Sequence, residues 1–192
     1  MNPSISLLSL ISSILHCLLV LNFCGGVYVK GDIVSDICKG QSMADPRINY
    51  DFCVSSLEAN PLSKTSDISG LAVISMDLCL KNATYIDTYI DSILKDGKAE
   101  PRILRNLKDC MEYYSTASEN VQKAMKAFNG KYYYEAINYI NNAGIWADTC
   151  KLGFTEFGDD FSLLKKQDND FFQLTSISLN IIAIIRGPKI LQ

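Results

Sequence analysis

The sequence predicts an all-α fold: an antiparallel four-helix bundle with an N-terminal helical hairpin, held together by two disulfides. Three observations predict it. Apolar residues recur at spacings of three and four in four consecutive segments, no segment alternates like a half-buried strand, and four cysteines lie at matching distances from predicted turns. A length of 192 residues with 48% hydrophobic composition suits a single domain with a packed core.

The N-terminus begins with an apolar run over residues 5–20, followed by the small residues Gly25 and Gly26. This arrangement is typical of a secretory signal peptide, which we expect to span residues 1–26 and to be removed. Because no Lys or Arg precedes the run, a retained membrane anchor is the alternative, although polar side chains interrupt the run. Export places the mature chain, residues 27–192, in an oxidising compartment where cysteines form disulfides.

The mature chain is predicted to open with a helical hairpin over residues 32–60, in which Asp45-Pro46 breaks two short helical stretches. A long amphipathic helix is predicted next, from 65 to 95. The short side chains of Ser66 and Asp67 can cap its first turn, and Gly97 ends it.

Three further helices complete the predicted bundle over residues 65–186. One runs from Pro101 to Asn129, with an apolar stripe opposite charged residues. The next, 131–153, carries small residues on its inward side, and the last, 170–185, is apolar over a wide arc. A helix that is apolar around so much of its surface must be surrounded by others, which favours four packed helices.

The disulfides follow from the height of each cysteine above its turn. In an antiparallel helical hairpin, residues equally far from the turn lie at the same height. Cys110 and Cys150 are each 20 residues from Gly130, and Cys38 and Cys53 are nearly equidistant from Asp45-Pro46, so each pair is predicted to be bonded. Cys79 is left as a buried free thiol, with a bridge to another chain as the alternative.

Composition excludes several classes of function. With 18 basic and 21 acidic residues and a net charge of −3, the chain lacks the positive field that nucleic acid requires. The single histidine, His16, lies in the predicted signal peptide, so the mature chain has no imidazole base for nucleophilic catalysis. It also has no Cys-x-x-Cys and no Gly-rich phosphate loop. We therefore expect neither an enzyme nor a metal or cofactor site, and no membrane contact after cleavage.

Acidic pairs are the remaining candidates for acid–base chemistry. Asp159 adjoins Asp160, Asp168 lies near Asp170, and Asp87 is followed by Asp91 one helical turn later. Nothing in the surrounding sequence predicts burial of these groups. We expect solvated surface pairs or helix caps rather than an acid–base couple.

Two further motifs concern the surface. Asn82-Ala83-Thr84 is an acceptor signature for N-glycosylation, but a helical wheel turns Asn82 toward the packed side, so an unmodified Asn82 is favoured.

The run 132–134 contains three consecutive tyrosines, which cannot all face inward on a helix. At least one is expected to be exposed at the bundle tip as an interface anchor, with core packing at a helix start as the alternative.

Several blocks of the mature sequence match a known family. They are Ile37-Cys38, YDFCV at 50–54, DISGLAVISMDL at 67–78, LKDC at 107–110, Ala136, and Thr149-Cys150 with Phe154. With these blocks the chain resembles the plant invertase and pectin methylesterase inhibitor family over residues 32–186. Within that family, YDFCVSSL at 50–57 and QLTSISL at 173–179 resemble the invertase inhibitors of the plane-tree pollen allergen type.

The resemblance implies a four-helix bundle with a helical hairpin and the same two bridges. It also implies a non-catalytic secreted protein that binds and occludes the active-site cleft of an acid invertase of the cell wall or vacuole. A pectin methylesterase is the alternative target, and a helical allergen or ligand-binding module without inhibitory activity is the second alternative. The implied location is the apoplast, with the vacuole less expected.

The family also suggests a target-binding site. Its invertase inhibitors carry a Pro-Lys-Phe motif between the second and third bundle helices, and counting back from Ala136 places this motif on Gly130, Lys131 and Tyr132. Lys131 is retained and Tyr132 keeps an aromatic ring, whereas Gly130 replaces the proline and is expected to loosen the turn. A register one residue later would instead resemble the tyrosine of the esterase inhibitors.

Overall fold

A computed structural model describes residues 32–156 and 158–188, and the predicted signal peptide lies outside them. The described residues belong to one compact unit, which begins at Asp32. They form α-helices and one short 3-10 helix, with no strand, which confirms the predicted all-α class. Among these helices, none has both the length and the apolar character needed to cross a membrane.

The unit begins with the predicted hairpin, formed by α2 (Ile33–Ala44) and α3 (Tyr50–Glu58), and continues through the 3-10 helix η1 (Pro61–Lys64). Each helix starts at a polar cap: the Asp32 side chain accepts from the Val34 N–H in α2. Asn side chains do the same at the start of α3 and η1. These caps satisfy first-turn donors that have no partner within the helix, so the short helices have defined starts.

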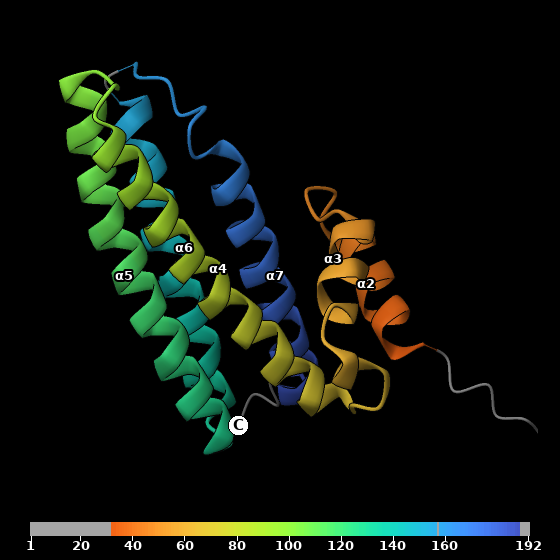
Figure 1. Cartoon of the computed structure of the whole chain (residues 1–192). Coiled ribbons are helices and arrows are strands. Elements are labelled where there is room, and N and C mark those ends of the chain that lie inside the picture. Colours follow the sequence, from red (N-terminus) through yellow and green to blue (C-terminus); the bar gives the residue numbers. More distant parts are fainter. Residues whose placement is uncertain (1–31, 157, 189–192) are drawn as a thin grey trace, which may run out of the picture. The chain divides into compact units, whose positions relative to one another are not determined.

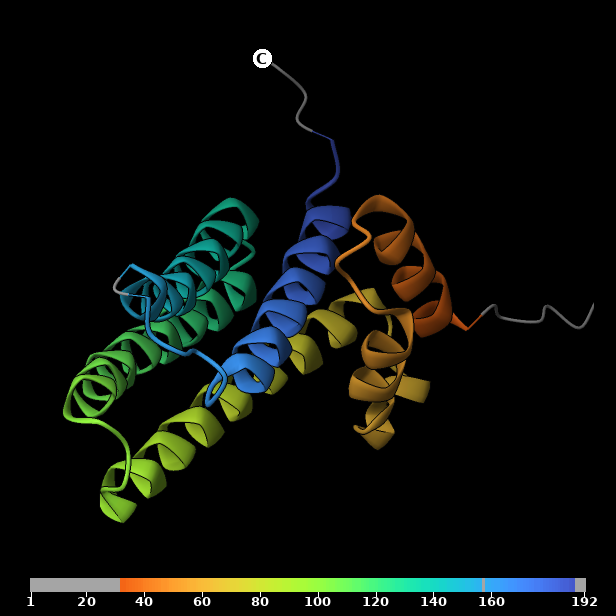
Figure 2. The same ribbon diagram turned by 90° about the horizontal axis from the view of Figure 1, so that it is seen from above.

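The bundle consists of α4 (Ile68–Asp96), α5 (Pro101–Asn129), α6 (Tyr133–Thr155) and α7 (Lys165–Arg186) (Figure 1). Each helix packs against the next, and α7 returns to α4, which closes the four-helix arrangement. Figure 2 shows α7 between the α5–α6 pair and the α2–α3 hairpin. The bounds of α5 are those expected from sequence. Helix α4 starts at Ile68, directly after its predicted cap Asp67, rather than at 65, and α6 and α7 also start at residues other than those predicted.

The differences at α6 and α7 have local causes. Helix α7 begins five residues before the predicted Asp170, and the Asp168 N–H donates to the Leu164 carbonyl at 2.8 Å to close its first turn. The sequence pattern missed this turn because it contains lysines and buried polar side chains rather than apolar ones. Helix α6 begins at Tyr133 instead of 131 because Lys131 has a left-handed backbone with φ of 63°.

The core runs through the bundle and under the hairpin, with Tyr114, Phe154 and Phe171 among its largest fully buried side chains. Disulfides join Cys38 to Cys53 and Cys110 to Cys150, with Cα–Cα distances of 5.6 and 4.8 Å. These are the pairs that the distances from the turns predict.

The remaining cysteine of the described residues, Cys79, is a buried free thiol. Its Sγ lies 3.4 Å from the Ser178 hydroxyl, and burial raises the pKa of the thiol to about 12. A thiol that is both covered and protonated is unreactive toward a second chain, so its surroundings favour a structural role.

Candidate functional site

The turn between α5 and α6 is closed by its own backbone. The Lys131 N–H donates to the Phe128 carbonyl, and the Tyr132 N–H donates to the Ala127 carbonyl, each at 2.9 Å. This nested pair of bonds is a Schellman motif, which satisfies the last carbonyls of a helix and fixes the direction in which the chain leaves it. The turn therefore holds Lys131 and Tyr132, two of the three residues predicted to bind a target, in a defined position.

Lys131 has the most unusual backbone of this turn. It is the one non-glycine residue with a positive φ, at 63°, in the part of the chain that the structure describes. The Schellman motif favours glycine at this place because a Cβ in the left-handed region costs about 1 kcal/mol. Here the glycine stands one residue earlier, so the turn holds a strained lysine instead. Such strain tends to collect at functional sites.

Gly130 has a different role from the one expected. Its φ is −78°, its N–H donates to the Lys126 carbonyl at 3.1 Å, and its backbone lies against the Tyr132 ring. A Cβ at this position would be 2.8 Å from Cδ2 and 2.9 Å from Cε2 of that ring. The expectation that Gly130 loosens the turn is therefore wrong: the absent side chain lets the ring close over the backbone.

The tyrosine run divides between surface and core. Tyr132 is 64% exposed and Tyr134 is 52% exposed, whereas the Tyr133 ring packs against the Phe128 ring with centroids 5.4 Å apart. The tip thus presents an exposed lysine followed directly by an exposed aromatic ring. This combination can enter a cleft, place a cation beside acidic groups, and stack a ring on a sugar or an apolar wall.

The glycosylation signature lies within a helix. Asn82 is half-buried in the middle of α4, its Oδ1 is buried without a hydrogen-bond partner, and the Thr84 hydroxyl donates to the Leu80 carbonyl at 3.0 Å. An amide turned toward neighbouring helices is a poor acceptor for a glycan. The geometry agrees with the expectation that Asn82 stays unmodified, which remains a prediction.

The expectation of solvated acidic pairs is wrong for two aspartates. The Asp159 side chain is 3% exposed and pairs with Arg102. Asp168 is 8% exposed and accepts a hydrogen bond of 3.2 Å from the Tyr114 hydroxyl. Burial raises the pKa of Asp168 to about 6, and burial also raises the pKa of the half-buried Asp87.

A sequence signal for the Asp168 contact does exist. Tyr114 lies on the inward stripe of the predicted second bundle helix, and a buried phenol usually finds a partner for its hydroxyl. An acidic residue on a facing helix can accept this hydrogen bond, but the sequence pattern alone does not distinguish Asp168 from the other acidic residues. Within the described ranges, no three His, Cys, Asp or Glu side chains gather as a metal site would require.

Comparison with known proteins gives a consistent result. A model of the plant invertase/pectin methylesterase inhibitor family matches residues 32–181. A "Putative invertase inhibitor" of Platanus acerifolia is 39% identical over 157 residues, which is 82% of this chain and 87% of the relative. A "Pectinesterase inhibitor" of Actinidia deliciosa is 26% identical over 164 residues, 85% of this chain and 84% of the relative.

A solved structure agrees at the level of the fold. The crystal structure of a mutant form of a pectin methylesterase inhibitor from Arabidopsis superposes with a TM-score of 0.60 at 22% sequence identity. The match covers 73% of this chain and 95% of the other chain. At that identity the likeness shows a shared helical fold and no more.

Proposed function

The chain belongs to the plant invertase/pectin methylesterase inhibitor family, and from this premise we propose that it inhibits an acid invertase by inserting Lys131 and Tyr132 into the active-site cleft. The family and the relatives are inhibitors, not enzymes. The choice of invertase is supported by the 39% identity to a relative that is named for invertase.

The observation that carries this proposal is the strained, exposed Lys131 beside the Tyr132 ring. Glycosidase clefts are lined by pairs of carboxylates, which attract a cation. Nested backbone bonds hold the turn, and the Cys110–Cys150 bridge joins the two helices that meet there. A rigid tip loses little conformational entropy on docking, so more of the contact energy appears as affinity.

The test is the double variant Lys131→Ala, Tyr132→Ala, titrated against purified acid invertase at acidic pH. If both side chains are interface anchors, the inhibition constant should rise about 30-fold or more. The matched control is Tyr85→Ala, Lys95→Ala, which removes an exposed tyrosine and an exposed lysine from α4. Its inhibition constant should be unchanged. Equal potency of wild type and tip variant would remove the tip from the mechanism.

Pectin methylesterase is the second candidate target. Its support is the Actinidia relative, which matches 85% of this chain. In that case the faces of α5 and α6 rather than the tip would make the contact. Titration of the wild type against both enzymes separates the two candidates, and failure against both would favour a helical allergen or ligand-binding module without inhibitory activity.

We also propose that the protein is secreted to the apoplast after removal of residues 1–26, with the vacuole as the less favoured destination. The apolar run at 5–20 supports this, although it lies outside the described residues. N-terminal sequencing of the protein recovered from plant extracellular fluid should start near Val27. A chain that keeps the apolar run and sediments with membranes would support the anchor instead.

A further inference from the structure

A hollow of about 910 Å³ opens between α6 and α7, beside the connection that joins them. This volume is in the range of small-molecule sites. The α6–α7 hollow is defined here by six of its lining residues: Lys151, Phe161, Lys165, Lys166, Asp168 and Phe172. None of these belongs to the tip, so a ligand bound in the hollow would be independent of the proposed inhibition of invertase.

The lining carries an excess of positive charge in a protein whose net charge is −3. Arg47, on the turn between α2 and α3, adds a fourth cation to the three lysines, against the carboxyls of Asp148 and Asp168. Two of the four cations are already paired, Arg47 with Asp45 and Lys166 with Asp170. Across the described parts of the chain, Lys151 and Lys165 have no carboxylate within 4.0 Å. Helix α7 also starts here without a side-chain cap, so its dipole adds to the positive potential.

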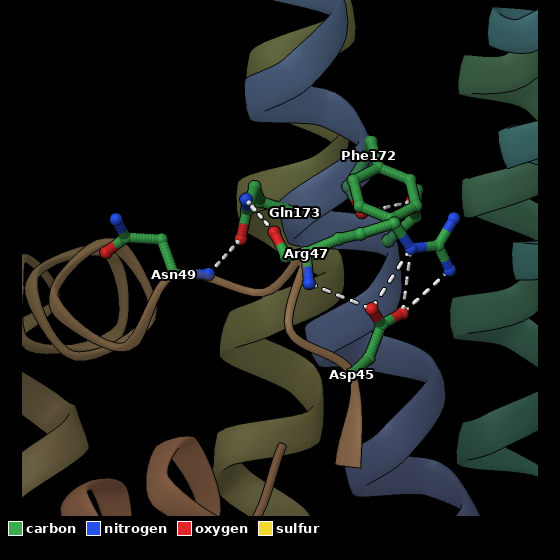
Figure 3. Close-up of polar contacts among 6 residues, drawn as sticks. Asp45, Arg47, Asn49, Phe172 and Gln173 are labelled. Atoms are coloured by element: carbon green, nitrogen blue, oxygen red, sulfur yellow. Dashed lines mark hydrogen bonds and ion pairs between the residues drawn. The ribbon is translucent and has the colours of Figure 1, made fainter. Parts of the chain in front are cut away.

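Two aromatic rings form apolar walls whose positions are fixed. The Phe161 ring packs edge-on against Phe154 at 5.3 Å. The Arg47 guanidinium lies 4.9 Å from the centre of the Phe172 ring and is held by Asp45, with 2.7 Å between Nη2 and Oδ2 (Figure 3). The other terminal nitrogen of Arg47 points away from Asp45 in this view (Figure 3). Walls that are already ordered reduce the entropy lost when a ligand binds.

Asp168 contributes a buried acid to the hollow. The charged and titratable groups that act on it are Tyr114 from α5, which donates to it, and Lys151 and Asp148 from α6. Asp87 on α4 acts in turn on Tyr114. Because burial raises the pKa of Asp168 to about 6, the group is protonated in mildly acidic solution. A protonated carboxyl does not repel an anion and can donate a hydrogen bond to it.

We propose that the α6–α7 hollow binds a small organic carboxylate with a flat aromatic body. Its carboxylate would lie between Lys151 and Lys165, and its ring against Phe161 and Phe172. Lysines alone would favour any anion and phenylalanines alone any apolar molecule, whereas the combination favours a molecule that has both features.

The first experiment is calorimetric titration of the folded, disulfide-bonded mature protein with sodium 2-naphthoate at pH 5.5. The neutral 2-naphthamide has a similar ring without the charge. We expect 2-naphthoate to bind at least about tenfold more tightly, the effect of one charge-assisted contact. Absence of 2-naphthoate binding, or equal binding of both probes, would overturn the proposal.

Variants locate the binding. The double variant Lys151→Gln, Lys165→Gln should weaken 2-naphthoate about tenfold or more, whereas the control Lys95→Gln, Lys123→Gln, with both changes outside the hollow, should not. Amide NMR shifts on adding the probe should cluster on α6 and α7 near Lys151 and Asp168. Equal affinities of the two double variants, or shifts spread over the surface, would show non-specific binding and refute the site.

The pH dependence tests the buried acid. Affinity for 2-naphthoate should fall as the pH rises from 5 to 7, because Asp168 loses its proton and then repels the probe. In Asp168→Asn the amide stays neutral, so affinity should remain constant over the same range. A pH dependence that persists unchanged in Asp168→Asn would contradict the placement of the carboxylate beside Asp168.

Discussion

The protein contains two helical hairpins, each closed by a disulfide, and they differ in what holds them. The long hairpin, α5–α6, has helices of 29 and 23 residues that pack along their length, and its bridge spans 40 residues of chain. The short hairpin, α2–α3, has helices of 12 and 9 residues with a bridge across 15. The long hairpin can bury a large apolar surface between its own two helices. The short hairpin has to bury its apolar surface against the bundle.

The turns show the same difference. The α5–α6 turn satisfies its backbone internally, so its tip is exposed and tolerates a left-handed Lys131. The α2–α3 turn is held from outside by Gln173 on α7. This side chain accepts from the Asn49 N–H at 3.0 Å and donates to the Arg47 carbonyl at 2.8 Å (Figure 3). A self-contained turn is free to face a partner, while a tethered one serves to fasten the hairpin.

Helix α7 contacts both hairpins, and it uses a different group for each. Toward the long hairpin it presents Asp168, which accepts from the Tyr114 hydroxyl of α5. Toward the short one it presents the neutral amide of Gln173. The first contact changes with pH because its acceptor can bind a proton, and the second does not. We therefore expect a change of pH to act on the contact between α7 and the long hairpin, and a substitution of Gln173 to act on the short hairpin.

Loss of the disulfides should have the largest effect. By chain entropy, the 40-residue bridge contributes about 4 kcal/mol and the 15-residue bridge about 3 kcal/mol. The double variant Cys110→Ala, Cys150→Ala should lower the free energy of global unfolding. Urea unfolding monitored by circular dichroism measures this change. Cys38→Ala, Cys53→Ala should mainly speed hydrogen exchange in α2 and α3. Equal acceleration of exchange in all helices of the second variant would contradict the independence of the two hairpins.

The Asp168 contact should make stability depend on pH by about 3 kcal/mol. The folded-state pKa of about 6 lies above the ordinary value of 3.8, so the folded protein binds the proton more tightly. The contribution of this tighter proton binding to the free energy of unfolding is complete below pH 4 and is lost as the pH rises through 6. In Asp168→Asn this loss should disappear, so the variant gains stability relative to wild type at pH 7.

Urea unfolding of both proteins at pH 4, 5, 6 and 7 measures this effect. The control is Asp109→Asn, which changes an exposed aspartate on α5 and should follow the wild-type curve. If wild type and Asp168→Asn lose stability in parallel between pH 4 and 7, the pH dependence arises from other groups.

Gln173→Ala should cost about 2 kcal/mol, because it removes two hydrogen bonds of a side chain that is 3% exposed. The backbone groups of Arg47 and Asn49 lose their partner, so the short hairpin should detach before the bundle unfolds. Hydrogen exchange should rise in α2 and α3 and stay unchanged in α5 and α6. The exposed Gln122→Ala is the control, and protection of the short hairpin equal to wild type would argue against the tether.

Local sequence signals predicted most of the fold because they act over short distances. Asp67 caps α4 through the Gly70 N–H at 2.8 Å, and Gly97 ends the helix with a left-handed φ of 64°. Both were predicted from residue type alone. The disulfide pairs followed from a count of residues around two turns, because antiparallel helices convert sequence distance into height.

The contacts that the sequence did not predict join residues far apart. Tyr114 and Asp168 are separated by 54 residues, and Asn49 and Gln173 by 124. Neither segment contains a local signal that identifies its partner, since several other acidic and amide residues occur in similar sequence surroundings. The left-handed backbone of Lys131 was missed for another reason: Gly130 directly precedes it, and glycine is the residue type that usually adopts this conformation at a helix end.

The smallest expected effect is the most informative about the tip. Lys131→Gly removes the Cβ from a left-handed residue and should stabilise the fold by up to about 1 kcal/mol. The reciprocal control is Gly97→Ala at φ 64°, which should destabilise by a similar amount. If Lys131 is retained for target binding despite its strain, Lys131→Gly should be more stable and yet a weaker inhibitor of invertase. A variant that gains stability without losing inhibition would mean that the strain serves no function at this turn.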